Sequence, residues 1–382
     1  MLSSIKIGII LVCFTAGLLT SISAHADNTG NVYMSDMIKI AAIYATTGIA
    51  ARSNGPSLTG VRLAVDEINE TGGILGKKID LIDLDNKSTA IGSKAAAEEA
   101  VRQHVEAIIG AAWSSHSLSI AEIAQKYKIP MITNISTHPE VTKKGDYIFR
   151  VCFTDPYQGK ILAEFARNDL NAKTADIITN VSNDYSIGLS RNFIDVFTSF
   201  GGKIITELHY VQKETDFTEL VKIVKKDDPD IVFIPGHYES VLIANELHKA
   251  AIRAIPLGGD GWITDNYYSM GGGNIPIAYY TEHWSKDAKN QMLKNFMDRY
   301  EKKYNPDSQM VLSYDAVMLF KDAVLRAGSF DRIKIKDALA HTKAYHGLTG
   351  MITLDENGDP QKSVVIFKIE NGEPHYLKTI NP

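Results

Sequence analysis

Short apolar runs alternate with amphipathic segments along most of the chain. The first run, residues 38–44, precedes a segment over about residues 56–70 in which apolar side chains recur every three or four positions. Pro56 suits the first turn of the predicted helix, and Gly72 and Gly73 suit its end. A strand followed by such a helix is the start of a βαβ unit, which is typical of a parallel sheet.

The same alternation continues after this first unit. Further strands are expected at about residues 79–84, 107–110, 175–179, 203–209 and 231–234, and helices at about 93–103, 186–200, 217–226 and 241–251. Late helices are expected at about 286–304, 310–327 and 333–341, and late strands at 352–354, 364–369 and 376–380. The pattern predicts two α/β units. Since no flexible linker separates them, we expect lobes joined by crossing strands, a geometry suited to hinge closure.

The N-terminus has the pattern of a secretion signal. Lys6 precedes an apolar run over residues 7–22, and Ala24 and Ala26 are small residues at the positions that a signal peptidase reads. The run is shorter than the roughly 20 residues that span a bilayer. We therefore expect cleavage after residue 26 and a soluble mature chain.

The amino-acid composition further limits the classes of protein to which the chain can belong. Of the 2 cysteines, Cys13 lies in the signal, where the bulky Val12 before it argues against a lipid anchor. Cys152 then stands alone, so no internal disulfide is expected and stability must come from a core. A hydrophobic content of 45% over 382 residues allows two such cores. The formal net charge of -5 argues against nucleic acid as a partner.

Candidate chemistry lies just after the strands, where ligands bind in open parallel sheets. After residues 107–110, Trp113 and Ser114 lead into a helix that Ser114 or Ser115 would cap. Exposed amides at a helix start, together with a hydroxyl, form a seat for a carboxylate. The alternative interpretation is an ordinary helix cap.

A second loop offers similar groups. It follows residues 130–133 and contains Ile135, Ser136 and Thr137, with a hydroxyl and backbone amides that suit the same carboxylate. The alternative is again a cap, with Pro139 in the first turn.

The second unit offers groups of opposite polarity. Tyr185, His237 and Asp260 each follow one of its strands, and Asp260 stands among glycines. We expect this carboxylate to have few neighbours and to be free to pair with a cation, although a turn aspartate is the alternative. Tyr185 suits a cation–π contact with the same cation. An anion seat opposite a carboxylate and an aromatic ring matches an α-amino acid.

Three stretches carry a resemblance to a known family. Residues 60–76 (GVRLAVDEINETGGILG), 113–117 (WSSHS) and 259–262 (GDGW) resemble segments of the branched-chain amino-acid-binding proteins of ABC transporters, and the likeness extends over about residues 38–369. It implies a type I periplasmic-binding-protein fold, an α/β architecture of two doubly wound parallel-sheet lobes joined by three crossovers. It also implies capture of an amino acid by hinge closure and delivery to a membrane permease.

The resemblance further implies boundaries and site residues. Lobe 1 would comprise residues 38–153 and 284–361, and lobe 2 residues 154–283 and 362–382. The implied ligand-binding residues fall in three groups. The carboxylate would meet Ser114, Thr137 and backbone groups near Ile135 and Ser136, the ammonium would meet Tyr185 and Asp260, and Ser53, Trp113 and His237 stand where relatives place other residues.

These last three positions leave the ligand's side chain open. Ser53 and His237 stand where some relatives have tyrosines, and Trp113 stands where some have a disulfide cysteine. The indole of Trp113 either lines the pocket or packs between lobes. With Tyr238 and Trp262 nearby in sequence, the pocket suits an aliphatic, aromatic or polar group.

Other functions were weighed against this one. A secreted α/β hydrolase would need a nucleophile elbow, but residues 110–114 lack its glycine spacing, and the neighbours Ser115 and His116 do not make a triad. No zinc motif is present, so neither a metal nor another cofactor is expected. A ligand-sensing receptor subunit would use the same fold and site. We expect a periplasmic monomer without enzymatic activity.

Overall fold

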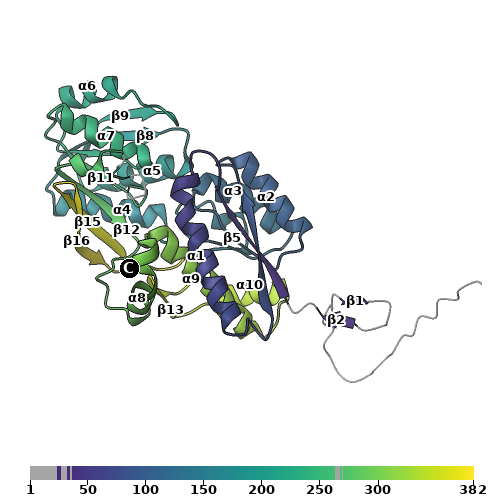
Figure 1. Cartoon of the computed structure of the whole chain (residues 1–382). Helices are drawn as coiled ribbons and strands as arrows, with labels where there is room; N and C mark the ends of the chain where they lie inside the picture. The colour runs from purple at the N-terminus through teal and green to yellow at the C-terminus, as the bar shows by residue number, and fades with distance from the viewer. Residues whose placement is uncertain (1–23, 27–31, 35–36, 263–266, 269) are drawn as a thin grey trace, which may run out of the picture. The chain divides into compact units, whose positions relative to one another are not determined.

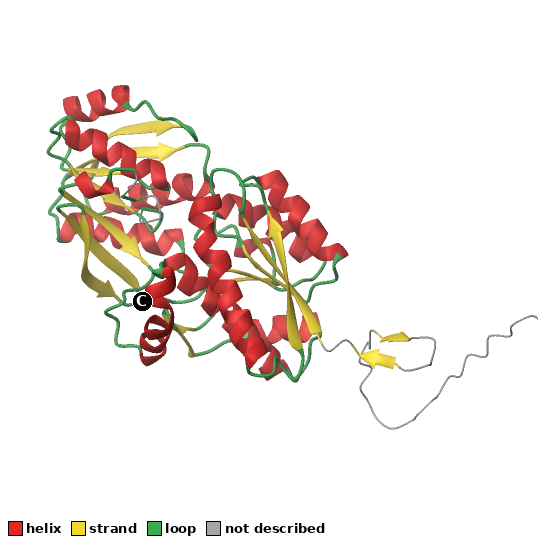
Figure 2. Ribbon diagram, in the orientation of Figure 1, coloured by secondary structure: helices red, strands yellow, loops and turns green. Residues whose placement is uncertain are grey.

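The computed structural model of the chain describes residues 24–26, 32–34, 37–262, 267–268 and 270–382 (Figures 1 and 2). The described residues before Met37 belong to a separate unit and form one short antiparallel pair, β1 (Ala24–Ala26) and β2 (Val32–Met34). Most of the expected signal peptide, residues 1–23, lies outside the described residues. Residues 37–382 form the second unit, which contains two main sheets.

The first sheet is parallel and has the strand order β4-β3-β5-β6-β7. Its strands are β3 (Met37–Tyr44), β4 (Lys78–Asp85), β5 (Ala107–Gly110), β6 (Met131–Thr133) and β7 (Ile148–Arg150). The helices near it are α1 (Ala51–Glu70), α2 (Ala90–Arg102), α3 (Ser114–Lys126), η1 (Thr142–Lys144), α8 (Gln291–Tyr304), α9 (Ser308–Ala327) and α10 (Arg332–Ala340). A small antiparallel pair, β13 (Tyr345–Gly347) and β14 (Gly350–Ile352), follows α10.

The second sheet has the order β16-β15-β12-β11-β10-β8-β9 and is parallel except at β15 and β16. Its strands are β8 (Thr174–Asn180), β9 (Lys203–Tyr210), β10 (Ile231–Phe233), β11 (Ile255–Gly258), β12 (Ile277–Glu282), β15 (Val364–Glu370) and β16 (Glu373–Ile380). Its helices are α4 (Asp155–Asn168), α5 (Asp184–Ser199), α6 (Thr218–Asp227), α7 (Tyr238–Lys249) and η2 (Gly272–Asn274).

Helices cover both faces of each sheet, because successive side chains of a strand point to opposite sides. In β3, Ile40 and Ala42 join the core under α1 and α9, whereas Ala41 and Ile43 join the core under α2 and α3. Figure 1 shows these two helix pairs on opposite sides of β5. The second sheet is built in the same way, with α4 and α5 on one face and α6 and α7 on the other. This accounts for the continuous apolar runs that predicted the strands.

The chain passes three times between the two sheets: after β7, after β12 and before β15. No helix among the described residues is long and apolar enough to cross a membrane. Cys152, in the first of the three passages, is a buried free thiol.

Several element boundaries differ from the prediction. Helix α1 begins at Ala51, so Pro56 lies inside the helix and not in its first turn. At this internal position the proline removes one backbone hydrogen bond of the helix. Helix α4 (residues 155–168) and strand β12 (residues 277–282) were not predicted. Helix α9 begins at Ser308, two residues before the predicted start at Met310.

Helices α1 and α9 meet at Gly60. A Cβ atom at this position would lie 2.1 Å from the carbonyl oxygen of Met310, so only glycine allows the two backbones to come so close. This contact places the N-terminus of α9 beside the middle of α1.

Candidate functional site

A cavity that is partly open to solvent lies between the strand-end loops of the two sheets. Most of the predicted site residues line it: Ser53, Trp113, Ser114, Ile135, Tyr185, His237 and Asp260. Ser136 and Thr137 are buried in the loop behind Ile135 and do not line the cavity. The cavity thus collects groups from both sheets, as expected for a ligand held between two lobes.

The start of α3 forms one wall of the cavity. Trp113 is the N-cap residue and makes no side-chain cap bond, so the prediction that Ser114 or Ser115 caps this helix was wrong. Ser114 is instead the first helical residue, and its hydroxyl accepts a hydrogen bond from the amide of His138 at 3.2 Å. The serine therefore ties α3 to the loop after β6.

The loop after β6 is held by its own polar groups. The Ser136 hydroxyl lies 3.0 Å from the carbonyl oxygens of both Ala111 and Ala112, and 2.7 Å from the Ser117 hydroxyl. The Thr137 hydroxyl lies beside the Asp155 carboxyl, although neither group makes a hydrogen bond of normal geometry there. The side chain of Ser136 thus shapes the wall without facing the cavity.

Four aromatic rings form a column across the cavity. The Trp113 ring stacks on His116 with a centroid distance of 5.4 Å and on His237 at 4.4 Å, and His237 in turn stacks on Tyr185 at 5.1 Å. Trp113 comes from the first sheet, whereas His237 and Tyr185 come from the second. Trp113 therefore lines the cavity and also packs against the opposite side. Burial lowers the pKa of His237 to about 4, so its ring is neutral at neutral pH.

Asp260 follows β11 and is the centre of a polar cluster. Its two carboxylate oxygens accept hydrogen bonds from Nε2 of Gln158 at 2.8 Å and from Nε2 of His283 at 2.9 Å. The prediction that Asp260 has few neighbours was wrong. The reason lies in Gly259, where a Cβ atom would come within 2.4 Å of Gln158 and Tyr185, so the turn abuts α4 and α5.

Asp260 nevertheless keeps its negative charge. Burial acts to raise its pKa, but the hydrogen bond and the electrostatic attraction of His283, together with hydrogen bonds from Gln158 and Tyr185, outweigh this effect and hold the pKa below its usual value. Burial lowers the pKa of His283, so its ring donates to Asp260 without cancelling the charge. A carboxylate has about four acceptor positions, which leaves Asp260 able to accept from a further donor.

The neighbouring buried acids differ from Asp260. Burial raises the pKa of Glu282 to about 8 and raises the pKa of Asp155 well above its usual value. The Glu282 carboxyl contacts the Ser308 hydroxyl and the amide of His283. At neutral pH the cluster therefore carries one dominant negative charge, on Asp260, which suits a ligand with a single positive charge.

Some cavity residues were missed by the sequence analysis. Asp307, Ser308 and Gln309 line the cavity at the start of α9, and Asp307 caps that helix by accepting from the amide of Met310 at 2.9 Å. The capping pattern of Asp307 was a usable signal, because an aspartate before a helix is a common N-cap.

The two further aromatic candidates have different places. Tyr238 lines the cavity beside His237. Trp262 is wholly buried, and its indole N–H donates to the carbonyl of Ile234 at 2.8 Å, so it supports the loop and is not part of the lining. Within the described residues, no group of three or more His, Cys, Asp or Glu side chains is arranged to hold a metal ion.

Comparison with known proteins identifies the family of the chain. Residues 37–374 match the family described as periplasmic binding protein. The chain belongs to the periplasmic binding protein family. Members are solute-binding proteins, and membership implies a location outside the cytoplasm.

Individual relatives of this binding protein agree with the resemblance stated above. The Leu/Ile/Val-binding protein homolog 3 of Brucella melitensis is 28% identical over 371 residues, which cover 95% of this chain and 96% of the relative. The leucine-binding protein LivK of Thermotoga maritima superposes with a TM-score of 0.86 at 37% identity, over 90% of this chain and 99% of that one. LivJ of Streptococcus pneumoniae, solved with isoleucine, superposes with a TM-score of 0.85 at 30% identity, over 91% and 100%. The predicted family and the predicted type I fold are confirmed.

Proposed function

We propose that this chain is an extracytoplasmic solute-binding protein that captures an α-amino acid, branched-chain or related, between two lobes. The observation that carries the proposal is the polarity of the cavity. One wall offers the start of α3 with the Ser114 hydroxyl, and the opposite wall offers the ionised Asp260 beside Tyr185. A zwitterion places its carboxylate at the first wall and its ammonium at the second. The relatives named for leucine, isoleucine and valine support this ligand class.

Each predicted site residue has a role in the proposal. Ser114, Thr137 and backbone groups of Ile135 and Ser136 receive the carboxylate, and Asp260 with Tyr185 receives the ammonium. Ser53, Trp113 and His237 then surround the ligand's side chain.

Each proposed lobe is built around one of the two sheets. Lobe 1 comprises residues 38–153 and 284–361, and lobe 2 comprises 154–283 and 362–382. Hinge closure brings Trp113 against His237, and the closed form delivers the ligand to the permease of an ABC transporter. The mature chain begins at Asp27, works as a periplasmic monomer and catalyses no reaction.

Calorimetric titration tests the proposal. The mature chain is freed of bound ligand by unfolding and refolding, and is then titrated with each of the common L-amino acids. Saturable binding of leucine, isoleucine, valine or a related amino acid is expected. Binding of none of them, by a chain with a cooperative unfolding transition, would overturn the proposed function.

A further inference from the structure

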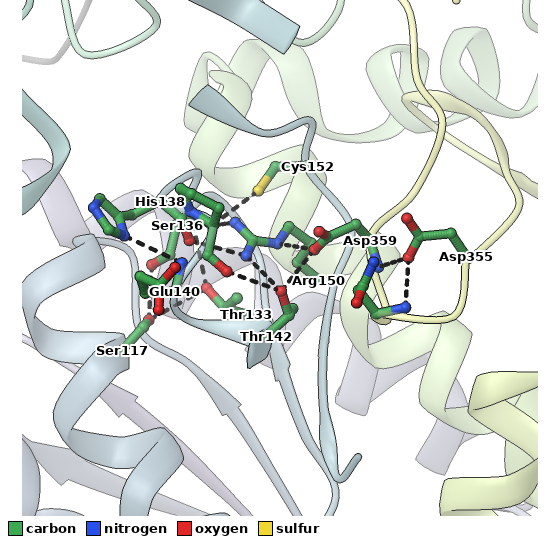
Figure 3. A network of polar contacts seen from close by, with 12 residues as sticks. Ser117, Thr133, Ser136, His138, Glu140, Thr142, Arg150, Cys152, Asp355 and Asp359 are labelled. Atoms are coloured by element: carbon green, nitrogen blue, oxygen red, sulfur yellow. Dashed lines mark hydrogen bonds and ion pairs between the residues drawn. The ribbon is translucent and has the colours of Figure 1, made fainter. Parts of the chain in front are cut away.

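Arg150 is wholly buried at the end of β7 and gathers the loop after β6 around its guanidinium group (Figure 3). Its Nη1 donates to the carbonyl of Ser136 at 2.5 Å, and its Nη2 donates to the carbonyl of His138 and the hydroxyl of Thr142, both at 2.9 Å. Its Nε lies 2.6 Å from Oδ1 of Asp359, with which it forms an ion pair. The charge of a deeply buried arginine is thus balanced by one carboxylate and three neutral acceptors.

The bond to Ser136 orients the peptide group between Ser136 and Thr137, and the bond to His138 orients the peptide group between His138 and Pro139. In a trans peptide the N–H points away from the preceding C=O, so the Thr137 amide points away from Arg150 when the Ser136 carbonyl points toward it. The His138 amide is fixed in turn by its bond to the Ser114 hydroxyl. Arg150 therefore determines which side of the loop presents donors and which presents acceptors.

Asp359 connects this arrangement to the third passage between the sheets. It follows a tight turn in which Asp355 accepts from the amides of Asn357 and Asp359, each at 2.9 Å. The carbonyl of Gly358 accepts from the Arg150 amide at 3.1 Å, so the turn is bonded to β7. The chain then enters β15 of the second sheet. The turn, β7 and the loop after β6 form one connected unit.

Arginine suits this place better than lysine. A guanidinium group donates in several fixed directions in one plane, whereas an ammonium group is a point charge with rotating donors. Lysine at position 150 would keep the charge beside Asp359 but lose the simultaneous grip on the Ser136 and His138 carbonyls.

We infer that Arg150 is a positioning residue for ligand recognition, with Asp359 as its anchor: together they orient the loop at residues 135–137 so that the Thr137 amide, which points away from Arg150, faces the ligand's carboxylate. This inference rests on the proposed function. Neither residue lines the cavity, so both act through the loop and not by contact with the ligand.

The test separates carboxylate recognition from general stability. Arg150→Lys and the wild type are titrated with L-leucine and with L-leucinamide, which lacks the carboxylate; if another amino acid binds best, it and its amide are used. Leucine affinity is expected to fall by roughly tenfold or more in the variant, whereas leucinamide affinity changes by less than about threefold. Equal losses for both ligands would show a merely structural role and overturn the inference.

Control variants cover the remaining outcomes. Arg326→Lys is a matched control, because Arg326 also holds a carboxylate, a carbonyl and a threonine hydroxyl, on Asp322, Ala338 and Thr342. Its affinities should equal those of the wild type. If Arg150→Lys does not fold, Asp359→Asn removes the ion pair while keeping the shape of the side chain at position 359. The comparison of leucine with leucinamide then tests the inference with this variant.

If leucinamide does not bind even the wild type, a double-mutant cycle tests the inference instead. The losses of leucine affinity in Arg150→Lys and Ser114→Ala should then be non-additive, because both act on the same carboxylate seat; additive losses would overturn the inference. A wild type that binds no amino acid refutes the proposed function itself, a result distinct from either of these.

Discussion

Asp260 shows how a buried carboxylate stays ionised while it has several partners. Its neighbours are neutral donors, so they stabilise the negative charge without cancelling it. The pairing with Gln158 and His283 was not predictable from the local sequence, because these residues lie 102 and 23 positions away along the chain. The glycines around Asp260 did identify the position, but they did not identify its surroundings.

Replacing Asp260 by Asn tests its proposed role. The change keeps the shape of the side chain but removes the charge that faces the ligand's ammonium. A charge-assisted bond in a closed site contributes on the order of 2 to 5 kcal/mol, so affinity should fall by roughly tenfold or more. The unfolding temperature without ligand should also fall, because Asn offers one acceptor oxygen where Asp260 accepts from both Gln158 and His283. Calorimetric titration measures the loss.

Asp176→Asn is the control for this experiment. Asp176 is also a buried aspartate of the second sheet, and it accepts a hydrogen bond from the Thr206 amide at 3.2 Å, but it does not line the cavity. Its replacement should leave affinity unchanged. Unchanged affinity in a folded Asp260→Asn variant would remove Asp260 from the site.

Glu282 gives a pH-dependent prediction. Its pKa is raised from 4.5 to about 8 by burial, so between these values the native state holds a proton that the unfolded state has lost. The free energy of unfolding should therefore fall as pH rises through this window. Glu282→Gln keeps the contact with Ser308 and removes the titration. Urea unfolding across the window should show a smaller decline in the variant, by up to about 1.4 kcal/mol per pH unit. Parallel curves would contradict the assignment.

At the scale of elements, most strands and helices could be predicted because both faces of each sheet are covered. Fully buried strands such as β3 and β5 read as continuous apolar runs, and the helices between them show helical periodicity. The misplaced starts of α1 and α9 had local causes. A proline was taken as a first-turn signal in α1, and the capping residue Asp307 was overlooked in α9.

Some residues of the candidate site could likewise be predicted from the sequence, and others could not. Residues in strand-end loops, such as Trp113, Tyr185 and Asp260, were found because parallel strands carry their ligands at their carboxyl ends. Gln158, His283 and Ser308 were missed, because they lie on the passages between sheets and at a helix start that only tertiary structure brings to the cavity. Local pattern carries no information on such long-range pairing.

The contact between α1 and α9 predicts opposite effects for two glycines of one helix. Gly60→Ala places a Cβ atom 2.1 Å from the Met310 carbonyl, so the helices must separate, at a cost of about 1 to 3 kcal/mol. Gly55→Ala meets nothing within 4 Å and should stabilise the chain by up to about 1 kcal/mol through helix propensity. Denaturant unfolding of both variants measures the difference. Equal effects of the two changes would contradict the close approach at Gly60.

At the scale of the whole molecule, closure should be visible in solution. Ligand is expected to reduce the radius of gyration, because the proposed lobes approach each other around the cavity. It should also change tryptophan fluorescence, since Trp113 stacks on His237 from the opposite side. Small-angle scattering and emission spectra with and without saturating L-leucine measure the two effects.

A single variant separates these two signals. Trp113→Phe should lose most of the fluorescence change while keeping the change in scattering. Identical scattering curves with and without ligand, under conditions where calorimetry shows binding, would refute closure.

The strand order of the second sheet has a consequence for how the chain becomes folded. β12 pairs with β15, and β15 pairs with β16, which ends at Ile380, so Val364 and Ile366 complete a core begun by α4 and β8 nearly 200 positions earlier. A ribosome must therefore have synthesised the chain past Ile366 before this core can form. Contacts so distant along the chain form slowly, and until they form the edge of β12 that pairs with β15 has no partner strand. Residues of β15, made long after α4 and β8, are thus the ones that end the nascent chain's exposure to aggregation and to proteases.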